Sequence, residues 1–134
     1  MKQNKLRVLF AVLALVLATL ACEFNASTAN ISDAYTARDN QGADRTTVFA
    51  QDDIFYAIVQ VANAPEDTVV KVVWYAVSTQ DFEPNLLLDQ VETTTSDASI
   101  PFKLSNEFLW SIGTYKVEIY LNGTLDRTLN FEVQ

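Results

Sequence analysis

Histidine is absent from the 134 residues of this chain, and its absence narrows the chemistry that the chain can perform. Histidine is the usual general base near neutral pH and the commonest metal ligand in proteins. Without it, neither a Ser–His nor a Cys–His nucleophile can be assembled. Lysine-based and two-carboxylate mechanisms remain open, but the sequence favours a protein that is not an enzyme.

Cysteine occurs once, at Cys22, so the chain cannot form an internal disulfide. A domain of about 110 residues can still be stable through an apolar core and β-sheet hydrogen bonds. An unpaired cysteine is unexpected in an oxidising compartment. The residues that precede Cys22 indicate which role this unpaired cysteine has.

A positively charged and then apolar leader precedes this cysteine. Lys2, Lys5 and Arg7 come before an uncharged run from Val8 to Ala21, which is the order found in secretory signals. The run is too short for a transmembrane helix, which needs about 20 apolar residues. We predict that residues 1–21 are a signal peptide.

The segment Thr19-Leu20-Ala21-Cys22 resembles the lipobox of bacterial lipoproteins. Thr19 and Leu20 depart from the leucine and small residue that this family prefers, whereas Ala21 fits. The resemblance implies cleavage before Cys22, lipidation of its thiol, and a location on the extracytoplasmic face of a membrane in the bacterial cell envelope. Two or three acyl chains would anchor the chain stably. The alternative is ordinary signal-peptidase cleavage nearby, with Cys22 discarded or left as a lone thiol.

Positive charge is scarce, with nine Lys and Arg against 17 Asp and Glu. Removal of the three leader cations changes the formal net charge from -8 to -11. Such a surface repels nucleic acid and anionic lipid headgroups, so neither is an expected direct partner. Cationic partners and calcium remain open, and acidity alone also keeps a secreted domain soluble.

Residues 23–30 form a short segment of mostly small and polar residues. This predicts a tether from residue 22 to 30 and one domain over 31–134. The domain shows no helical period over 11 residues and is rich in strand patterns. Eight strands are predicted: Ile31 to Ala37, Thr46 to Phe49, Ile54 to Val61, Val69 to Val77, Leu86 to Thr93, Ser99 to Leu104, Thr114 to Leu121 and Thr128 to Val133. Eight short strands without helices indicate a two-sheet sandwich.

Two segments carry the clearest phasing. Apolar and polar residues alternate from Thr114 to Leu121, and Asn122-Gly123 then suits the two positive-φ positions of a type I′ turn, which predicts an antiparallel hairpin. Lys71 marks one side of its strand as partly solvated, which puts Trp74 inside. Pro101 lacks an N–H, so its strand should lie at an edge or begin at that residue.

Val72-Val73-Trp74-Tyr75 resembles the tryptophan strand of the immunoglobulin-like fold, and Gly113-Thr114-Tyr115-Lys116-Val117 resembles its tyrosine corner. The resemblance implies an all-β, antiparallel immunoglobulin-like sandwich of seven to eight strands with no disulfide. Val117 stands where antibody domains place the second cysteine, and Ala57 or Val59 stands near the first. The chain is thus nearer bacterial immunoglobulin-like or fibronectin-like modules. The expected structural core includes Trp74, Tyr115, Val117 and Phe131.

Aromatic residues raise the possibility of a binding surface. Tyr75, Tyr120 and Phe82, together with Trp110, could present rings to a sugar or a protein. Outer aromatics more often pack across neighbouring strands. We expect Trp110, beside Phe108, to plug the open end of the sandwich.

Acidic residues suggest two more specific functions, calcium binding and glycoside hydrolysis. The segment Asp39 to Asp44 and the pair Asp52-Asp53 could ligate calcium, but their spacing does not match an EF-hand, and a solvated turn with Gly42 at its tip is the prediction. Glu66-Asp67, or Asp81 with Glu83, supply the paired acids that a glycosidase needs, although such pairs are expected by chance in so acidic a chain. No cofactor or metal is predicted.

The sequence thus favours a membrane-anchored, extracytoplasmic lipoprotein that acts as a non-enzymatic protein-binding or spacing module. Its expected partner is an envelope protein or polysaccharide. The alternatives are a small carbohydrate-binding module that uses exposed aromatics and a cation-stabilised surface spacer. An immunoglobulin-like architecture hosts many unrelated tasks, so the fold does not choose among them.

Overall fold

The computed structural model describes residues 28–134 of the chain. The predicted signal peptide and Cys22 lie outside the described residues. Residues 28–134 contain no helix, and so none that could cross a membrane.

Eight strands make up the described chain, and each overlaps one predicted from the sequence. They are β1 (Asn30–Ala37), β2 (Val48–Phe49), β3 (Phe55–Ala62), β4 (Thr68–Thr79), β5 (Leu86–Thr95), β6 (Ala98–Leu104), β7 (Gly113–Leu121) and β8 (Thr124–Val133). β1 begins at Asn30, one residue before the predicted domain boundary. β8 begins four residues earlier than predicted, because pairing resumes directly after a two-residue turn.

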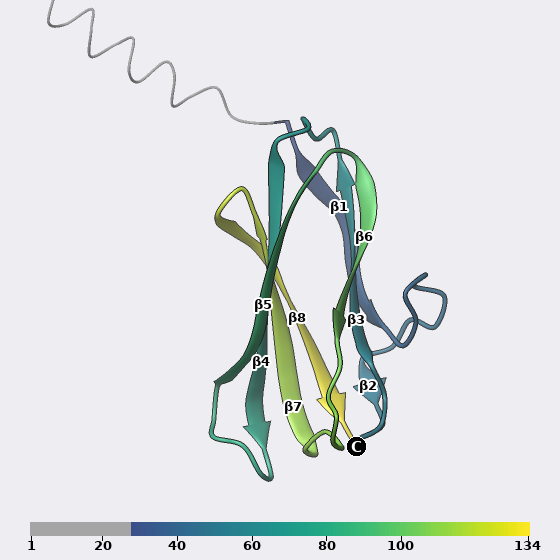
Figure 1. Ribbon diagram of the computed structural model, residues 1–134, viewed down its shortest axis with the longest axis vertical. Coiled ribbons are helices and arrows are strands. Elements are labelled where there is room, and N and C mark those ends of the chain that lie inside the picture. Colours follow the sequence, from purple (N-terminus) through teal and green to yellow (C-terminus); the bar gives the residue numbers. More distant parts are fainter. Residues whose placement is uncertain (1–27) are drawn as a thin grey trace, which may run out of the picture.

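The strands form two layers, of order β1-β3-β6 and β2-β8-β7-β4-β5 (Figure 1). Strand neighbours run antiparallel except for β2 and β8, whose short pairing is parallel. The prediction of an all-β, two-sheet sandwich is confirmed. β6 is an edge strand and contains Pro101, in agreement with the expectation from its missing N–H.

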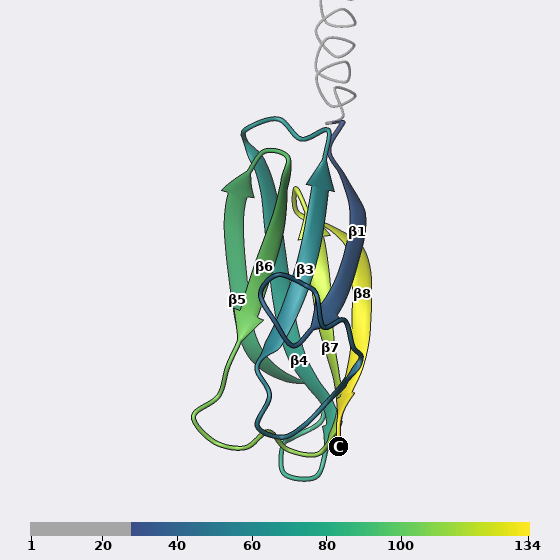
Figure 2. The same cartoon turned by 90° about the vertical axis from the view of Figure 1, so that its right-hand side faces the viewer.

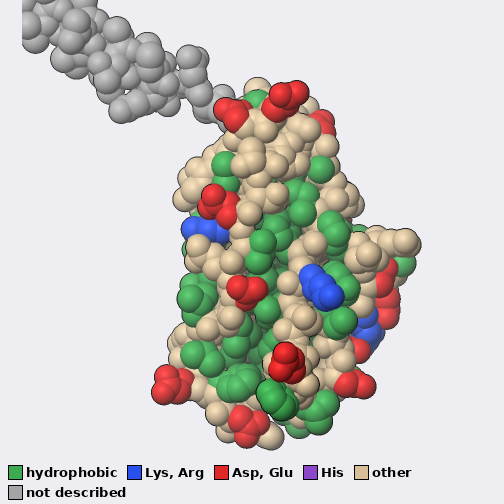
Figure 3. Space-filling view, viewed as in Figure 1, with side chains coloured by type: hydrophobic (Ala, Val, Ile, Leu, Met, Phe, Trp, Pro, Cys, Tyr) green, Lys and Arg blue, Asp and Glu red, His purple; other side chains and the backbone are tan. Residues whose placement is uncertain are grey.

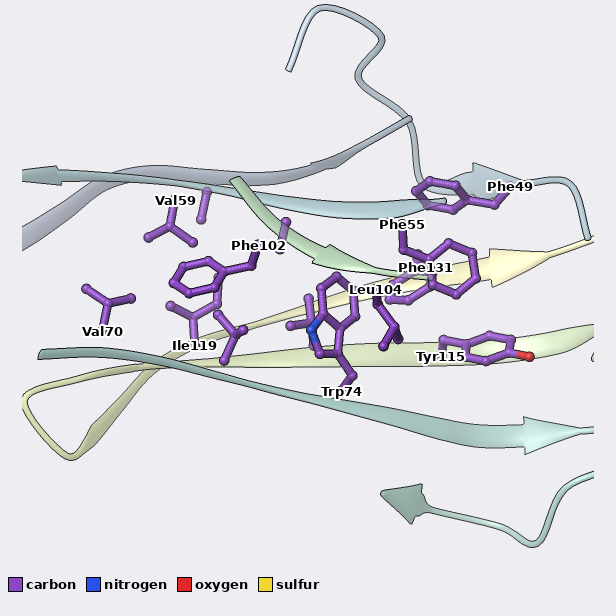
Figure 4. Close-up of a cluster of buried hydrophobic side chains, with 14 of the residues drawn as sticks. Phe49, Phe55, Val59, Val70, Trp74, Phe102, Leu104, Tyr115, Ile119 and Phe131 are labelled. Carbon is purple, nitrogen blue, oxygen red and sulfur yellow. The ribbon is translucent and has the colours of Figure 1, made fainter. Parts of the chain in front are cut away.

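The core lies between the sheets and is built largely from aromatic rings (Figure 4). Phe55 on β3 stands at its centre, with ring centroids 4.8 Å from Phe49, 4.9 Å from Phe131 and 5.6 Å from Tyr115. The structure places the four residues expected in the core there: Trp74, Tyr115, Val117 and Phe131. The described core contains no cysteine, so aromatic and aliphatic packing alone fills it.

The last hairpin folds as predicted. Asn122 and Gly123 have φ angles of 49° and 83°, and Tyr115 on β7 pairs with Phe131 on β8. Because side chains alternate along a strand, this register turns Val117 and Phe131 to the same buried face.

The sandwich has two distinct ends (Figures 1 and 2). At one end the described chain begins, where the Thr28 hydroxyl donates to the Asn63 carbonyl over 2.8 Å. At the other lie the loops 50–54, 80–85 and 105–112, which we call the loop end. β4 connects the two ends with 12 residues, or about 40 Å at ~3.3 Å per residue.

Candidate functional site

The loop end carries two large apolar side chains in solvent. Phe108 is 79% exposed and Leu109 is 63% exposed. Single exposed apolar residues are common on protein surfaces, whereas contiguous apolar patches mark interaction sites. This adjacent pair makes the loop end the candidate site. We call this pair the Phe108–Leu109 ridge. The sequence predicted that Trp110, beside Phe108, plugs the end of the sandwich; Trp110 is buried there, and its neighbour Phe108 is exposed.

Trp110 is buried and fixed on one side of the ridge. Its ring stacks on Phe55 with centroids 4.4 Å apart. Its backbone N–H donates to the Gln51 carbonyl over 2.8 Å, and its indole Nε1–H donates to the Asp53 carbonyl over 2.9 Å. The Gln51 amide returns a bond to the Trp110 carbonyl over 2.9 Å. These contacts fasten loop 105–112 to loop 50–54.

Ser111 fastens the same loop to loop 80–85. Its hydroxyl donates to the Asp81 carboxylate over 2.9 Å and accepts from the Asp81 backbone N–H over 3.0 Å. The Ser111 carbonyl accepts from the Tyr115 hydroxyl, four residues later, as in a tyrosine corner. Burial, and secondarily the charge of Asp81, raise the pKa of Tyr115 to about 12. The hydrogen bonds of Trp110 and Ser111 therefore fix the backbone next to the ridge in the free protein.

Hollows lie on both sides of the ridge. The first, of about 480 Å³, is lined by Phe82 and by the side chains of Leu86, Leu88 and Leu104. The second, of about 430 Å³, lies beside Ile54 and is lined on that side by the polar residues of loop 50–54. Both hollows also include Phe108 and Leu109 in their walls. Figure 3 shows hydrophobic side chains running along the open side of the sandwich toward this end.

The rim of the loop end is acidic. Its three loops contain neither Lys nor Arg and carry these carboxylates: Asp52, Asp53, Asp81, Glu83 and Glu107. Arg38 reaches the rim from outside these loops and pairs with Asp53 over 3.1 Å. An apolar ridge surrounded by negative charge is therefore the main surface feature of this end.

The predicted aromatic surface is not assembled as one patch. Tyr75 and Tyr120 lie on the outer face of the five-stranded sheet, whereas Phe82 packs against the core at the loop end. The Lys116 ammonium lies 4.9 Å from the centre of the Tyr75 ring, and the Lys71 ammonium lies 4.5 Å from that of Tyr120. Their own cations therefore occupy faces of these rings that a sugar would need for stacking.

The segment proposed for calcium is organised around Asp39. Its carboxylate accepts backbone N–H bonds from Gln41, Ala43 and Asp44 over 3.2, 3.0 and 2.7 Å. The bonds from Asp44 and Ala43 contribute most to lowering the pKa of Asp39. Within residues 28–134, no three metal-ligating side chains gather at one place. The Asp39 carboxylate caps its own loop.

The paired acids considered for a glycosidase lie at opposite ends of the sandwich. Glu66 and Asp67 belong to the β3–β4 loop beside the start of the described chain, and Asp81 and Glu83 belong to the loop end (Figure 1). Within the second pair, the Asp81 carboxylate accepts a hydrogen bond from the Ser111 hydroxyl over 2.9 Å. Nothing in the sequence pattern had singled out the Phe108–Leu109 ridge as exposed.

Neither a family model nor a curated protein matches the sequence. Among solved structures, an immunoglobulin-like protein from Pseudomonas aeruginosa matches with a TM-score of 0.50 and 16% identity, over 79% of this chain and 96% of that one. The fold is immunoglobulin-like. This agrees with the resemblance drawn from the tryptophan strand and the tyrosine corner.

Two larger enzymes contain a similar fold. An alkylpurine DNA glycosylase from Pseudomonas fluorescens matches with a TM-score of 0.51 and 13% identity, over 81% of this chain and 31% of that one. A beta-glucosidase from Listeria innocua matches with a TM-score of 0.50 and 13% identity, over 83% of this chain and 17% of that one. This chain spans only a small part of either enzyme, and the likeness is one of fold.

Proposed function

We propose that this protein is a membrane-anchored, extracytoplasmic lipoprotein whose immunoglobulin-like domain binds another protein by contact. The observation that carries the proposal is the position of the Phe108–Leu109 ridge. It lies at the end of the sandwich opposite Thr28, where the chain enters the domain (Figure 1). A lipid on Cys22 would hold the domain by one end and leave the ridge facing away from the membrane.

The rigidity of the base supports a binding role. Exposed aromatic side chains on a fixed backbone lose little conformational freedom when a partner covers them. Trp110 and Ser111, which directly follow the ridge in the chain, hold the loop through backbone and side-chain hydrogen bonds to loops 50–54 and 80–85. The ridge is therefore preorganised for binding.

A carbohydrate-binding module is the second candidate, and the exposed ring of Phe108 is the observation that favours it. Most of the residues that line the first hollow are leucines and aromatic residues, whose apolar surfaces offer no hydrogen bonds to sugar hydroxyls; Asp81, Ser105, Asn106 and Ser111 line the rest. We therefore place a protein partner before a polysaccharide.

Site-specific photo-crosslinking in intact cells tests the proposed function. A photoreactive residue replaces Leu109 in the full chain, and the matched control carries it at Leu125, which is 46% exposed on the β7–β8 hairpin at the other end. We expect a discrete protein adduct from position 109 and none from position 125. Equal adducts from both positions, or none from position 109, would reject binding through the loop end.

A further inference from the structure

We infer that the Phe108–Leu109 ridge docks a positively charged protein segment bearing a large apolar side chain. The inference rests on the proposed binding function and specifies its partner. It combines three observations at the loop end: an apolar hollow, an acidic rim, and strand edges unsuited to pairing with another strand.

The hollow selects the apolar part of the partner. Its walls combine the ridge with four more apolar side chains, at a volume of about 480 Å³: Phe82, Leu86, Leu88 and Leu104. Ser105 and Asn106 line it as well, next to the ridge in the chain. The buried hydroxyl in its wall, that of Ser111, is already used twice by Asp81. An apolar side chain that enters the hollow is therefore favoured over a sugar, because it removes apolar surface from water without needing new hydrogen bonds.

The rim selects the charge of the partner. Loops 50–54, 80–85 and 105–112 contribute carboxylates and no cation, and only Asp53 is paired with an arginine, Arg38. Complementary charge speeds encounter and suppresses wrong partners. The same rim disfavours a second copy of this chain and an anionic lipid surface, since both would bring negative charge against it.

The neighbouring strand edges disfavour binding by strand addition. Pro101 removes a backbone donor from the edge strand β6. On β5, an edge strand of the five-stranded sheet, the Gln90 N–H donates to the Asp89 carboxylate over 2.8 Å, and the β4–β5 register is broken between Asp89 and Leu87. Interrupted edges are poor templates for a new strand. The segment is therefore recognised through its side chains.

Three fluorescent synthetic peptides of equal length serve as probes. One has Lys and Arg flanking a central Leu-Trp pair, one replaces that pair with Ser, and one replaces the cations with Glu. Each is titrated by fluorescence anisotropy against the full lipidated chain in neutral phosphatidylcholine nanodiscs, with empty nanodiscs as the blank. We expect binding of the cationic, apolar peptide alone, and weaker binding at high salt.

Variants of the chain separate the two halves of the inference. Phe108→Ser with Leu109→Ser should weaken binding roughly tenfold or more, as loss of a central apolar contact does. The matched control, Leu87→Ser with Leu125→Ser, removes two other exposed leucines and should leave binding unchanged. Glu83→Gln with Glu107→Gln should weaken binding and flatten its salt dependence. Each variant is compared at equal folded fraction, measured by thermal melting.

The contrary outcomes are distinct. Equal binding of the Ser-substituted peptide would overturn the apolar half, and equal binding of the Glu-substituted peptide would overturn the charge half. Ridge-dependent binding on a glycan array, without peptide binding, would assign the surface to carbohydrate. If position 109 crosslinks a protein in cells but the cationic, apolar peptide does not bind, the partner chemistry is wrong while the binding function stands. Absence of crosslinks from position 109 rejects binding through the loop end, on which the inference rests.

Discussion

Tyr115 joins the core of the sandwich to the loop that carries the ridge. Its ring is stacked on Phe131, with centroids 5.5 Å apart and planes inclined by 17°. Its hydroxyl reaches the Ser111 carbonyl at the foot of loop 105–112. A single side chain therefore couples core packing to the position of the exposed surface.

Tyr115→Phe should lower the free energy of unfolding by about 1–3 kcal/mol, because the buried Ser111 carbonyl loses its donor. Urea denaturation followed by tryptophan fluorescence measures the change. Tyr56→Phe, on the outer face of β3, is the matched control and should have little effect. Equal effects of the two substitutions would show that the tyrosine corner does not stabilise the domain.

The same variant should also change the response to alkaline pH. The pKa of Tyr115 is about 12 in the folded state, above its ordinary value of 10.0, because burial disfavours the phenolate. Its contribution to stability is complete below pH 10 and is lost as pH rises toward 12. The wild type should therefore lose more stability than Tyr115→Phe across this range.

Trp74 shows how strongly packing governs the core. The side chain is fully buried, and its Nε1–H has no hydrogen-bond partner. A buried donor without a partner costs free energy. Its ring lies 6.0 Å from that of Phe131 and 6.5 Å from that of Phe55, and this aromatic packing offsets the missing bond.

At the scale of elements, the β7–β8 turn does more than reverse the chain. The Asn122 N–H donates to the Val69 carbonyl over 2.8 Å, and the Asn122 side-chain oxygen accepts from the Val69 N–H over 2.9 Å. The turn is thus fastened to the start of β4 as well as to its own hairpin. Loss of its geometry would disturb three neighbouring strands.

Gly123→Val should destabilise the domain by about 1–3 kcal/mol, because φ at this position is 83° and a β-branched residue is strained there. No atom outside the neighbouring residues lies within 4 Å of a Cβ built at Gly123, so the loss comes from the backbone.

Gly113→Ala should destabilise the domain more than Gly123→Ala, since a Cβ at Gly113 would overlap the Ser78 carbonyl and Thr79. Thermal melting gives both comparisons, and a Gly123→Val variant that melts with the wild type would contradict the strain argument.

At the scale of the whole molecule, the proposed function depends on the placement of an anchor and a ridge at opposite ends. We expect Cys22→Ser to release the protein from the membrane fraction or to stall its processing, because a serine cannot receive a thioether-linked diacylglyceryl group. Ser27→Ala, in the same predicted tether, should stay in the membrane fraction. Mass spectrometry that finds a free thiol on a membrane-free mature chain would contradict lipidation.

The sequence by itself determined the eight strands, the inward side of Trp74 and the last hairpin. These features depend on alternation with a period of two and on a turn dipeptide, which are local signals. Only the tertiary structure decided that Phe108 is exposed two residues from buried Trp110, and that Phe82 lies apart from Tyr75. A loop has no repeating period to fix which side chains turn inward. The outcome depends on Phe55, Gln51 and Asp53, which lie more than 50 residues earlier in the chain and meet loop 105–112 only when the sheets pack.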